Sequence, residues 1–205
     1  MPRILVTFAI VLGMGLTPVL AQGISNDPSQ APAGAYDLEN RHSQVMFAIP
    51  HIGLTDFWGR FDRLSGTLSF DGAALEKSSV SITIDMSSID TPSTRLNSEL
   101  TSASVFDAQT YPNATFQSTA VVRTGPDTGR ITGNLTLHNV TKPATLDVTF
   151  NGGEANPMGN NYVLGFHATT TIRRSDFGLT GMPWEPMVGD EVKLVIEAMF
   201  IQKKS

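Results

Sequence analysis

The four histidines are the residues of this chain best suited to chemistry. Enzymes that use a nucleophile or a metal place a histidine beside a nucleophile, a carboxylate or further ligands. His42 and His51 lie an odd number of positions apart, so a regular strand separates them onto opposite faces, although Pro50 allows a bulge between them. His138 and His167 stand alone in their segments. The chain also lacks cysteine, an HExxH spacing and a Gly-x-Ser-x-Gly motif, and we therefore predict no catalytic residue, no metal and no cofactor.

Two adjacent arginines form the other polar feature with a possible functional role. Adjacent residues of a strand point to opposite faces, so only one of Arg173 and Arg174 faces the interior. We choose Arg174, which lies near Asp176 in the sequence. It either orients the head group of a bound ligand or forms a structural ion pair.

Strands with one apolar face must position these groups. Apolar residues recur at every second position in segments such as 45–49, 80–84, 146–150 and 192–198, which is typical of strands with one buried face. Many such strands without a long helix predict an all-β protein, either a sandwich or a barrel. The expected strands cover residues 36–39, 44–52, 56–70, 79–85, 114–122, 130–137, 144–151, 162–172 and 191–202.

One short helix is expected over residues 92–105. Thr91 is its expected cap, Pro92 suits the first helical position, and Leu96, Leu100 and Ala103 share a face that should lie against the sheet or plug one end of a barrel.

The last expected strand is apolar on both faces. Val195, Met199 and Ile201 lie opposite the face that carries residues 192, 194, 196 and 198. A barrel strand exposed to water should be polar on its outer face, so either the helix or a second subunit should cover these residues. A homodimer is therefore one expectation.

The first residues resemble a cleaved signal peptide. Residues 1–21 contain Arg3, a short apolar run and small residues before a cleavage point after Ala21. Residues 22–35 are rich in small and polar residues and predict a flexible leader, and residues 36–205 form one domain. Export combined with the absence of cysteine favours a bacterial periplasm, where the fold must depend on burial alone.

The charge balance excludes some partners. The net charge is −5, which repels phosphate backbones and makes nucleic acid an improbable ligand. No basic amphipathic stretch supports stable membrane insertion.

Several ordered blocks of sequence resemble the YceI-like family of exported, lipocalin-like proteins that bind polyisoprenoids. These blocks are His42-Ser43 with residues 45–61, Phe106-Asp107 with Tyr111-Pro112, Leu135-Thr136-Leu137-His138 with Val140-Thr141-Lys142-Pro143, and residues 174–179 with Val188-Gly189-Asp190. The resemblance implies an antiparallel, lipocalin-like β-barrel of about eight strands with one short helix. The elongated apolar lumen of this barrel is expected to hold one extended lipid chain, of the polyprenol or quinone type. Phe57-Trp58 is bulkier than in many relatives and is expected to reshape one end of this lumen.

The inward-facing residues of the alternating strands are the predicted lining of the lumen. They are Val45, Phe47, Ile49, Val80, Ile82, Ile84, Phe116, Leu135, Leu137, Leu146, Val148 and Phe150. The same residues fill the core completely in small barrels without a cavity. The family resemblance favours the open lumen.

The segment 175–190 is an apolar loop that we expect at the mouth of the barrel. It carries Phe177, Leu179, Met182, Trp184 and Met187 among glycines and prolines. Apolar side chains gather in a loop when they cover something. The loop is either a flap, with Phe177 and Trp184 touching the ligand, or a segment packed permanently onto the barrel end.

These observations predict a periplasmic, non-enzymatic carrier or store for a long-chain isoprenoid lipid. Two alternatives remain at this point. One is a hydrolase or isomerase that acts on a lipid in the same cavity through His42 or His51 and a carboxylate such as Asp107. The other is a filled barrel that binds another protein through its last strand.

Overall fold

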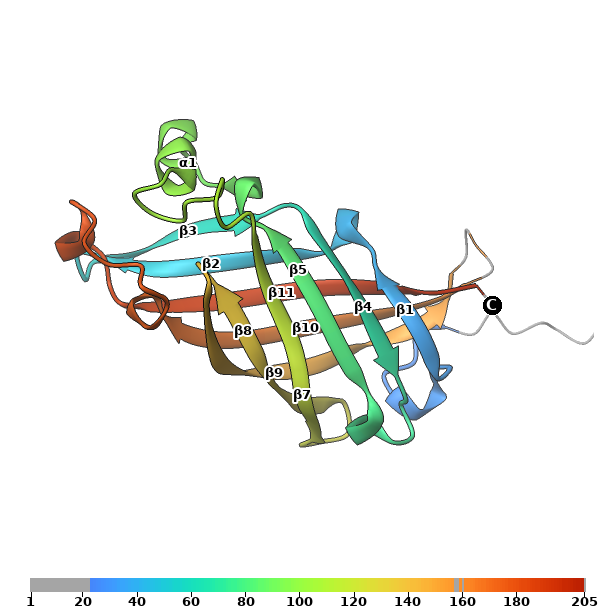
Figure 1. The fold of residues 1–205 in the computed structure, drawn as a ribbon. Helices are drawn as coiled ribbons and strands as arrows, with labels where there is room; N and C mark the ends of the chain where they lie inside the picture. Colours follow the sequence, from blue (N-terminus) through green and yellow to red (C-terminus); the bar gives the residue numbers. More distant parts are fainter. Residues whose placement is uncertain (1–22, 157–158, 160, 205) are drawn as a thin grey trace, which may run out of the picture.

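The computed structural model describes residues 23–156, 159 and 161–204 (Figure 1). The expected signal peptide over residues 1–21 lies outside this range. The strands are β1 (Gly34–Leu38), β2 (Gln44–His51), β3 (Thr55–Phe61), β4 (Leu64–Phe70), β5 (Ser79–Asp85), β6 (Ile89–Asp90), β7 (Asn113–Arg123), β8 (Thr128–Leu137), β9 (Val140–Ala155), β10 (Tyr162–Arg173) and β11 (Glu191–Gln202). The α-helix is α1 (Thr94–Thr101), and the 3₁₀ turns are η1 (Pro28–Gln30), η2 (Asn40–His42), η3 (Leu75–Lys77), η4 (Met86–Ser88), η5 (Arg174–Phe177) and η6 (Glu185–Met187).

The sheet closes into an antiparallel barrel. The strand order β1-β4-β5-β7-β8-β9-β10-β11 returns to β1 through a further pairing of β1 with β11. These eight strands form the closed ring, while β2, β3 and β6 extend it at one end. There β2 continues β1 along β11, and β3 pairs with β2. The pairings of this ring are antiparallel, and the predicted lipocalin-like β-barrel is confirmed.

The segment expected to be one strand over residues 56–70 is two strands. The chain bends at Asp62 and Arg63. β3, before the bend, pairs with β6, whereas β4, after the bend, pairs with β5. The backbone N–H of Asp62 donates to Ser88 O at 3.2 Å, and Arg63 Nε donates to Asp85 Oδ2 at 2.8 Å. The buried face changes at the bend from odd positions, as at Phe61, to even positions, as at Leu64 and Leu68. The single strand expected over residues 56–70 overlooked this shift in the alternation. We call the end of the barrel where β2, β3 and β6 extend the ring the wide end.

The helix is shorter than predicted and begins later. Ser93 is the N-cap and accepts a hydrogen bond from Leu96 N, whereas the hydroxyl of Thr91 bonds to the side chain of Asn97. Since α1 ends at Thr101, Ala103 lies beyond the helix and is exposed. Figure 1 shows α1 beside β3 at the wide end of the barrel. Among the described residues, no helix is long and apolar enough to cross a membrane.

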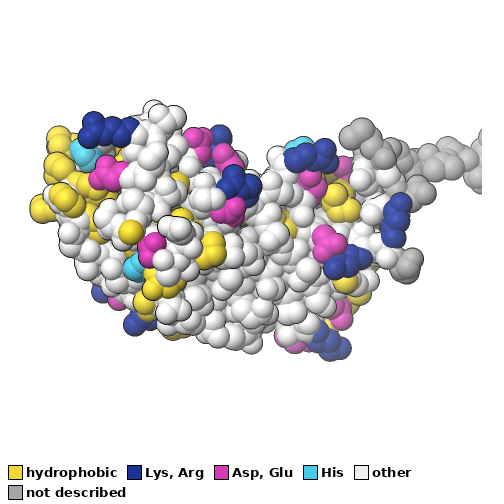
Figure 2. Space-filling model, turned by 45° about the horizontal axis from the view of Figure 1, so that its top comes forward, with side chains coloured by type: hydrophobic (Ala, Val, Ile, Leu, Met, Phe, Trp, Pro, Cys, Tyr) yellow, Lys and Arg dark blue, Asp and Glu magenta, His cyan; other side chains and the backbone are white. Residues whose placement is uncertain are grey.

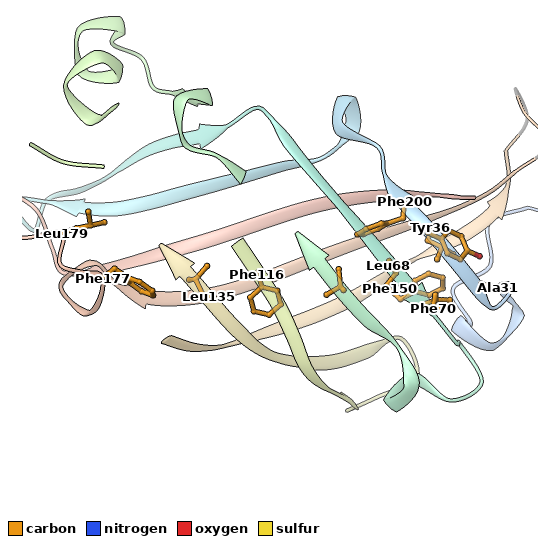
Figure 3. Close-up of a cluster of buried hydrophobic side chains, with 12 residues drawn as sticks. Ala31, Tyr36, Leu68, Phe70, Phe116, Leu135, Phe150, Phe177, Leu179 and Phe200 are labelled. Carbon is orange, nitrogen blue, oxygen red and sulfur yellow. The ribbon is translucent and has the colours of Figure 1, made fainter. Parts of the chain in front are cut away.

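Aromatic side chains fill the opposite end of the barrel. Tyr36 and Phe70 meet edge to face with ring centroids 6.3 Å apart, and Phe166 lies 5.3 Å from Phe150 and 5.9 Å from Phe200. Figure 3 shows Tyr36, Phe70, Phe150 and Phe200 grouped together at this end. Burial of such rings against one another contributes beyond the area they remove from water.

The segment before β1 covers the aromatic end, which corrects the expectation of a flexible leader over residues 22–35. Pro28 and Ala31 are buried, and Ser25 forms a bridge with Gly153 of β9. A side chain at Gly72 would collide with the carbonyl of Pro28. The domain that the structure describes therefore includes this segment.

The outer face of β11 is half-buried at Val195, Met199 and Ile201. Helix α1 packs at β6 and lies over the wide end, so it is not the expected cover for these residues. A second subunit at this face stays a prediction.

Candidate ligand-binding cavity

The wide end of the barrel is hollow. A main cavity of about 370 Å³ lies there, within the range of about 300–1,000 Å³ that is usual for small-molecule sites. Nearly all of its lining side chains are apolar, and His51 and Arg174 are the titratable exceptions. The lining includes the predicted residues Val45, Phe47, Ile49, Ile84, Leu135, Leu137, Arg174 and Trp184.

Alternation along the strands explains how the predicted lining residues come together. Val45, Phe47 and Ile49 share the inner face of β2, and Ile196 and Leu194 of β11 stand opposite Val45 and Phe47. A side chain at Gly59 of β3 would occupy the position of the Phe47 ring, so this glycine allows the ring to pack flat against β3.

Part of the wall comes from outside the barrel strands. Leu96 and Leu100 of α1, followed by Val105 and Phe106, line the cavity where the bend at residues 62–63 opens the sheet. The sequence placed Leu96 and Leu100 on one face of the predicted helix. It did not predict that this face lines the cavity, because that depends on the bend between β3 and β4. The other lining residues not predicted are His51, Phe57, Phe61, Met86, Ala114, Ile172, Leu179, Met182, Met187, Val188, Val192 and Leu194.

A second, small cavity of about 60 Å³ lies near the aromatic end. Val80, Val148 and Phe150, which were expected in one continuous lumen, line this small cavity instead. Leu68, Phe70, Ile131 and Phe166 are among their neighbours in the lining. The interior is therefore divided, unlike the single elongated lumen that the family resemblance implies.

Four predicted lining residues line neither of these two cavities. Ile82 and Phe116 lie in the core at the level between the cavities, Leu146 packs against the same core beside Ile131, and Phe177 is 2% exposed. The pairing of β10 with β9 runs from Tyr162 to Thr169. Beyond Thr169, η5, which contains Phe177, takes the place of β10 beside β9 in the wall of the barrel. Alternation reveals which face Ile82, Phe116 and Leu146 are on but not how far along the barrel the space extends, and it therefore assigned these three residues to one lumen. Phe177 was expected to touch the ligand from the loop, and it lies in the buried core instead.

Arg174 is buried and organises the loop. Its Nε donates to Gly189 O at 3.1 Å, and its Nη1 donates to Leu179 O at 2.6 Å and to Glu185 Oε1 at 3.1 Å. The ion pair is thus with Glu185 and not with Asp176. Hydrogen bonds from Gly181 N and from Arg174 lower the pKa of Glu185. This arrangement supports the structural role for Arg174 over direct binding of a head group.

The loop of residues 175–190 packs onto the barrel end. Leu179 and Met182 are buried, and the Ser175 backbone N–H and hydroxyl both donate to the Asp190 carboxylate, at 3.0 and 2.8 Å. Partial burial of Asp190 raises its pKa, but these two hydrogen bonds and nearby arginines outweigh it and lower the pKa overall. Trp184 Nε1 donates to Glu99 Oε1 of α1 at 2.8 Å and so joins the loop to the helix. The structure favours the packed loop over the free flap.

The mouth of the cavity lies between this loop and the β2–β3 turn. Met187 lines the cavity yet is 46% exposed, and its carbonyl accepts a hydrogen bond from Ile52 N at 2.6 Å. Ile52 and Leu54 are both exposed in the turn beside it. Figure 2 shows hydrophobic side chains gathered at this end of the molecule. The mouth of the cavity therefore has an apolar rim.

The histidines are dispersed. His42 Nδ1 lies 2.6 Å from Glu39 and His167 Nδ1 lies 2.7 Å from Glu197, both at the surface. His138 occupies the β8–β9 turn with a positive φ of 49°, and its ring packs on Tyr111. His51 alone lines the main cavity, at the mouth. Within the described ranges, no group of three or more histidine, aspartate or glutamate side chains is placed to hold a metal ion.

The closed antiparallel barrel and its apolar cavity define a lipocalin-like barrel of the kind that encloses small apolar molecules. The model of the YceI-like domain matches residues 36–200, and the chain belongs to this family. A UPF0312 protein of Pseudomonas savastanoi pv. phaseolicola is 40% identical over 154 residues, which cover 74% of this chain and 80% of that protein. A UPF0312 protein of Pseudomonas putida strain W619 is 39% identical over 177 residues, covering 85% of this chain and 88% of that protein.

Solved structures agree with the fold. Burkholderia cenocepacia BcnA superposes with a TM-score of 0.71 at 27% identity, covering 79% of this chain and 98% of that one. The Campylobacter jejuni YceI protein gives a TM-score of 0.65 at 28% identity, covering 71% of this chain and 85% of that one. A polyisoprenoid binding domain from Saccharophagus degradans gives 0.61 at 17% identity and covers 84% of this chain and all of that domain, a likeness of fold alone.

Proposed function

We propose that this protein is a non-enzymatic carrier or store for a long-chain isoprenoid lipid of the polyprenol or quinone type. The observation that carries the proposal is the main cavity, which is lined almost entirely by apolar side chains and opens between apolar residues. Each methylene-sized group that leaves water for such a cavity contributes about 0.8 kcal/mol. A lipid tail can therefore bind tightly without an elaborate polar site. The name of the S. degradans domain points to the same class of ligand.

The tail end of the lipid occupies the main cavity in this proposal, and the head group stays at the mouth. His51 is the polar lining residue placed to hydrogen-bond that head group, because Arg174 already donates to two carbonyls and to Glu185. Export to the periplasm through the expected signal peptide over residues 1–21 belongs to the proposal.

A lipid-acting hydrolase or isomerase has less support. That reaction needs a carboxylate beside a histidine in the cavity. Among the described residues, neither His42 nor Asp107 lines the main cavity, and its lining contains no aspartate, glutamate, serine or threonine. We therefore favour binding over catalysis.

Solvent extraction of the purified protein followed by mass spectrometry tests the proposal. We expect to recover a prenyl lipid in amounts comparable to the protein, or to see stoichiometric uptake of added farnesol by delipidated protein. Recovery of no lipid together with no uptake of farnesol or a quinone would contradict it.

A further inference from the structure

One aromatic side chain, that of Phe116, lies at the level between the two cavities and is in the lining of neither. Along the inner face of β8, Leu135 lines the main cavity, Ile131 lines the small cavity, and Gly133 lies between them. Along β5, Ile84 and Val80 likewise line the main and the small cavity, with Ile82 between them. The boundary between the cavities therefore runs through the level of Gly133 and Ile82.

Phe116 of β7 fills this boundary. It pairs with Ile82 on one side and with Leu135 on the other. A Cβ atom at Gly133 would lie 2.5 Å from the Cζ atom of Phe116, so the ring extends from the level of Leu135 across the bare backbone of Gly133. Figure 3 shows Phe116 between Leu135 on one side and the group of Phe150, Phe70 and Tyr36 on the other.

Two of the other boundary positions carry a small side chain or none. Gly133 has no side chain, and Ala168 of β10, between the strand positions of Ile172 and Phe166, carries only a methyl group. Ile82 lies over Gly66 of β4 in the same way that Phe116 lies over Gly133. Phe116 is thus the largest side chain among these four boundary residues, and it is 7% exposed.

From this geometry we infer that Phe116 is an internal stop that sets the length of chain the barrel accepts. The inference rests on the proposed function and adds a specificity-determining residue to it. A prenyl tail enters at the mouth, fills the main cavity and ends at Leu135 and Ile84, beyond which the ring of Phe116 occupies the core. Removing the ring joins the two cavities and lets further isoprene units reach Val80, Ile131 and Val148.

A series of prenols tests the inference on the full-length protein. Farnesol and the longer geranylgeraniol are bound to delipidated wild-type protein and to the variants Phe116→Ala and Phe116→Leu. The matched control is Phe200→Ala, which removes a buried ring of the same barrel that lines neither of the two cavities. We expect Phe116→Ala to raise the affinity for geranylgeraniol relative to farnesol by about tenfold. Phe116→Leu should shift the ratio less in the same direction, and Phe200→Ala should keep the wild-type ratio.

The outcomes separate the inference from the proposed function. If both Phe116 variants bind both prenols with the wild-type ratio of affinities, the inference that Phe116 is a stop is overturned, while the proposed carrier function still holds. Loss of all prenol binding in folded Phe116→Leu would also overturn it, since Phe116 would then be part of the binding wall. Failure of wild-type protein to bind either prenol would overturn both. Truncation of a buried phenylalanine to alanine lowers the free energy of unfolding by about 3–5 kcal/mol, which can prevent folding. If Phe116→Ala does not fold, the ratio measured with Phe116→Leu alone tests the inference.

Discussion

Arg174 Nη1 and Glu185 Oε1 lie 3.1 Å apart across the two sides of the loop that covers the cavity. Arg174 is 8% exposed and reaches Gly189 O and Leu179 O with its remaining contacts, so one guanidinium joins three points of the loop. The planar fork of arginine suits this task, and a lysine cannot reproduce it.

Replacement of this arginine should loosen the loop. We expect Arg174→Lys to lower the free energy of unfolding by about 2–3 kcal/mol, because buried hydrogen bonds from a charged group are lost. Denaturant unfolding measures this change, and hydrogen exchange should accelerate within residues 175–190. The neighbouring Arg173 is exposed, and Arg173→Lys should change stability by less than about 0.5 kcal/mol. Unchanged exchange in Arg174→Lys would show that the loop holds without its guanidinium.

Filling the main cavity should abolish binding without unfolding the protein. Ala114 is 4% exposed and its methyl group lines the cavity. We expect Ala114→Phe to weaken farnesol binding by at least about tenfold while the Tm stays within a few degrees of wild type or rises, because the ring enters existing space. Ala120 lies on the same strand and is exposed, so Ala120→Phe is the matched control. Equal farnesol binding by both variants would place the ligand elsewhere.

Trp184 should report on occupancy of the cavity. The chain has two tryptophans, and Trp58 is 48% exposed whereas Trp184 lines the main cavity. In Trp58→Phe we expect farnesol to shift the fluorescence emission of Trp184 to shorter wavelength, since the ligand displaces water from the indole. The complementary variant Trp184→Phe should lose this response and keep its affinity within a few fold. A response that survives in Trp184→Phe and vanishes in Trp58→Phe would contradict the position of the site.

Alkaline pH should destabilise the aromatic end through Tyr36. Burial, with a smaller contribution from Tyr162, raises the pKa of Tyr36 to about 12. A raised pKa means that the folded state holds its proton more tightly than the unfolded chain, so this stability is complete below the ordinary pKa of about 10 and is lost as the pH rises through the folded value. We expect the free energy of unfolding to fall by about 2–3 kcal/mol over this window.

The variant Tyr36→Phe isolates this effect. It removes the hydrogen bond from the hydroxyl to Pro32 O at 2.6 Å, which should cost about 1 kcal/mol at neutral pH. Most of the alkaline slope should disappear with the hydroxyl. Denaturant unfolding at neutral pH and at a series of alkaline pH values measures both the cost of the lost hydrogen bond and the dependence of stability on pH. If the free energy of unfolding of Tyr36→Phe falls with pH as steeply as that of the wild type, other groups cause the alkaline loss.

Alternation in the sequence was sufficient to predict an all-β sandwich or barrel and the inner face of its strands, and the family resemblance selected the barrel. Val45, Phe47 and Ile49 face the cavity as expected because a strand places every second residue on the same side. The same rule holds no information on depth along the barrel, and so Val80 and Val148 were assigned to one lumen with Val45 although they line a separate cavity.

Other parts of the site depend on contacts between distant segments. Phe61 and Leu100 line the cavity because the sheet divides at residues 62–63 and α1 fills the opening. The sequence does mark that division, because the buried face changes from odd positions, as at Phe61, to even positions, as at Leu64, but the strand expected over residues 56–70 ran across this shift. The partner of Arg174 was missed for another reason. Asp176 is nearer in the sequence, but the 3₁₀ turn of η5 leaves Glu185 as the carboxylate that meets the guanidinium.

A crystal structure of the protein with bound farnesol tests the central claim most directly. We expect continuous electron density for the prenyl chain inside the barrel, with the hydroxyl near His51 and the terminal isoprene unit at Leu135 and Ile84. Density for farnesol only on the outer surface, with the main cavity free of it, would contradict the account.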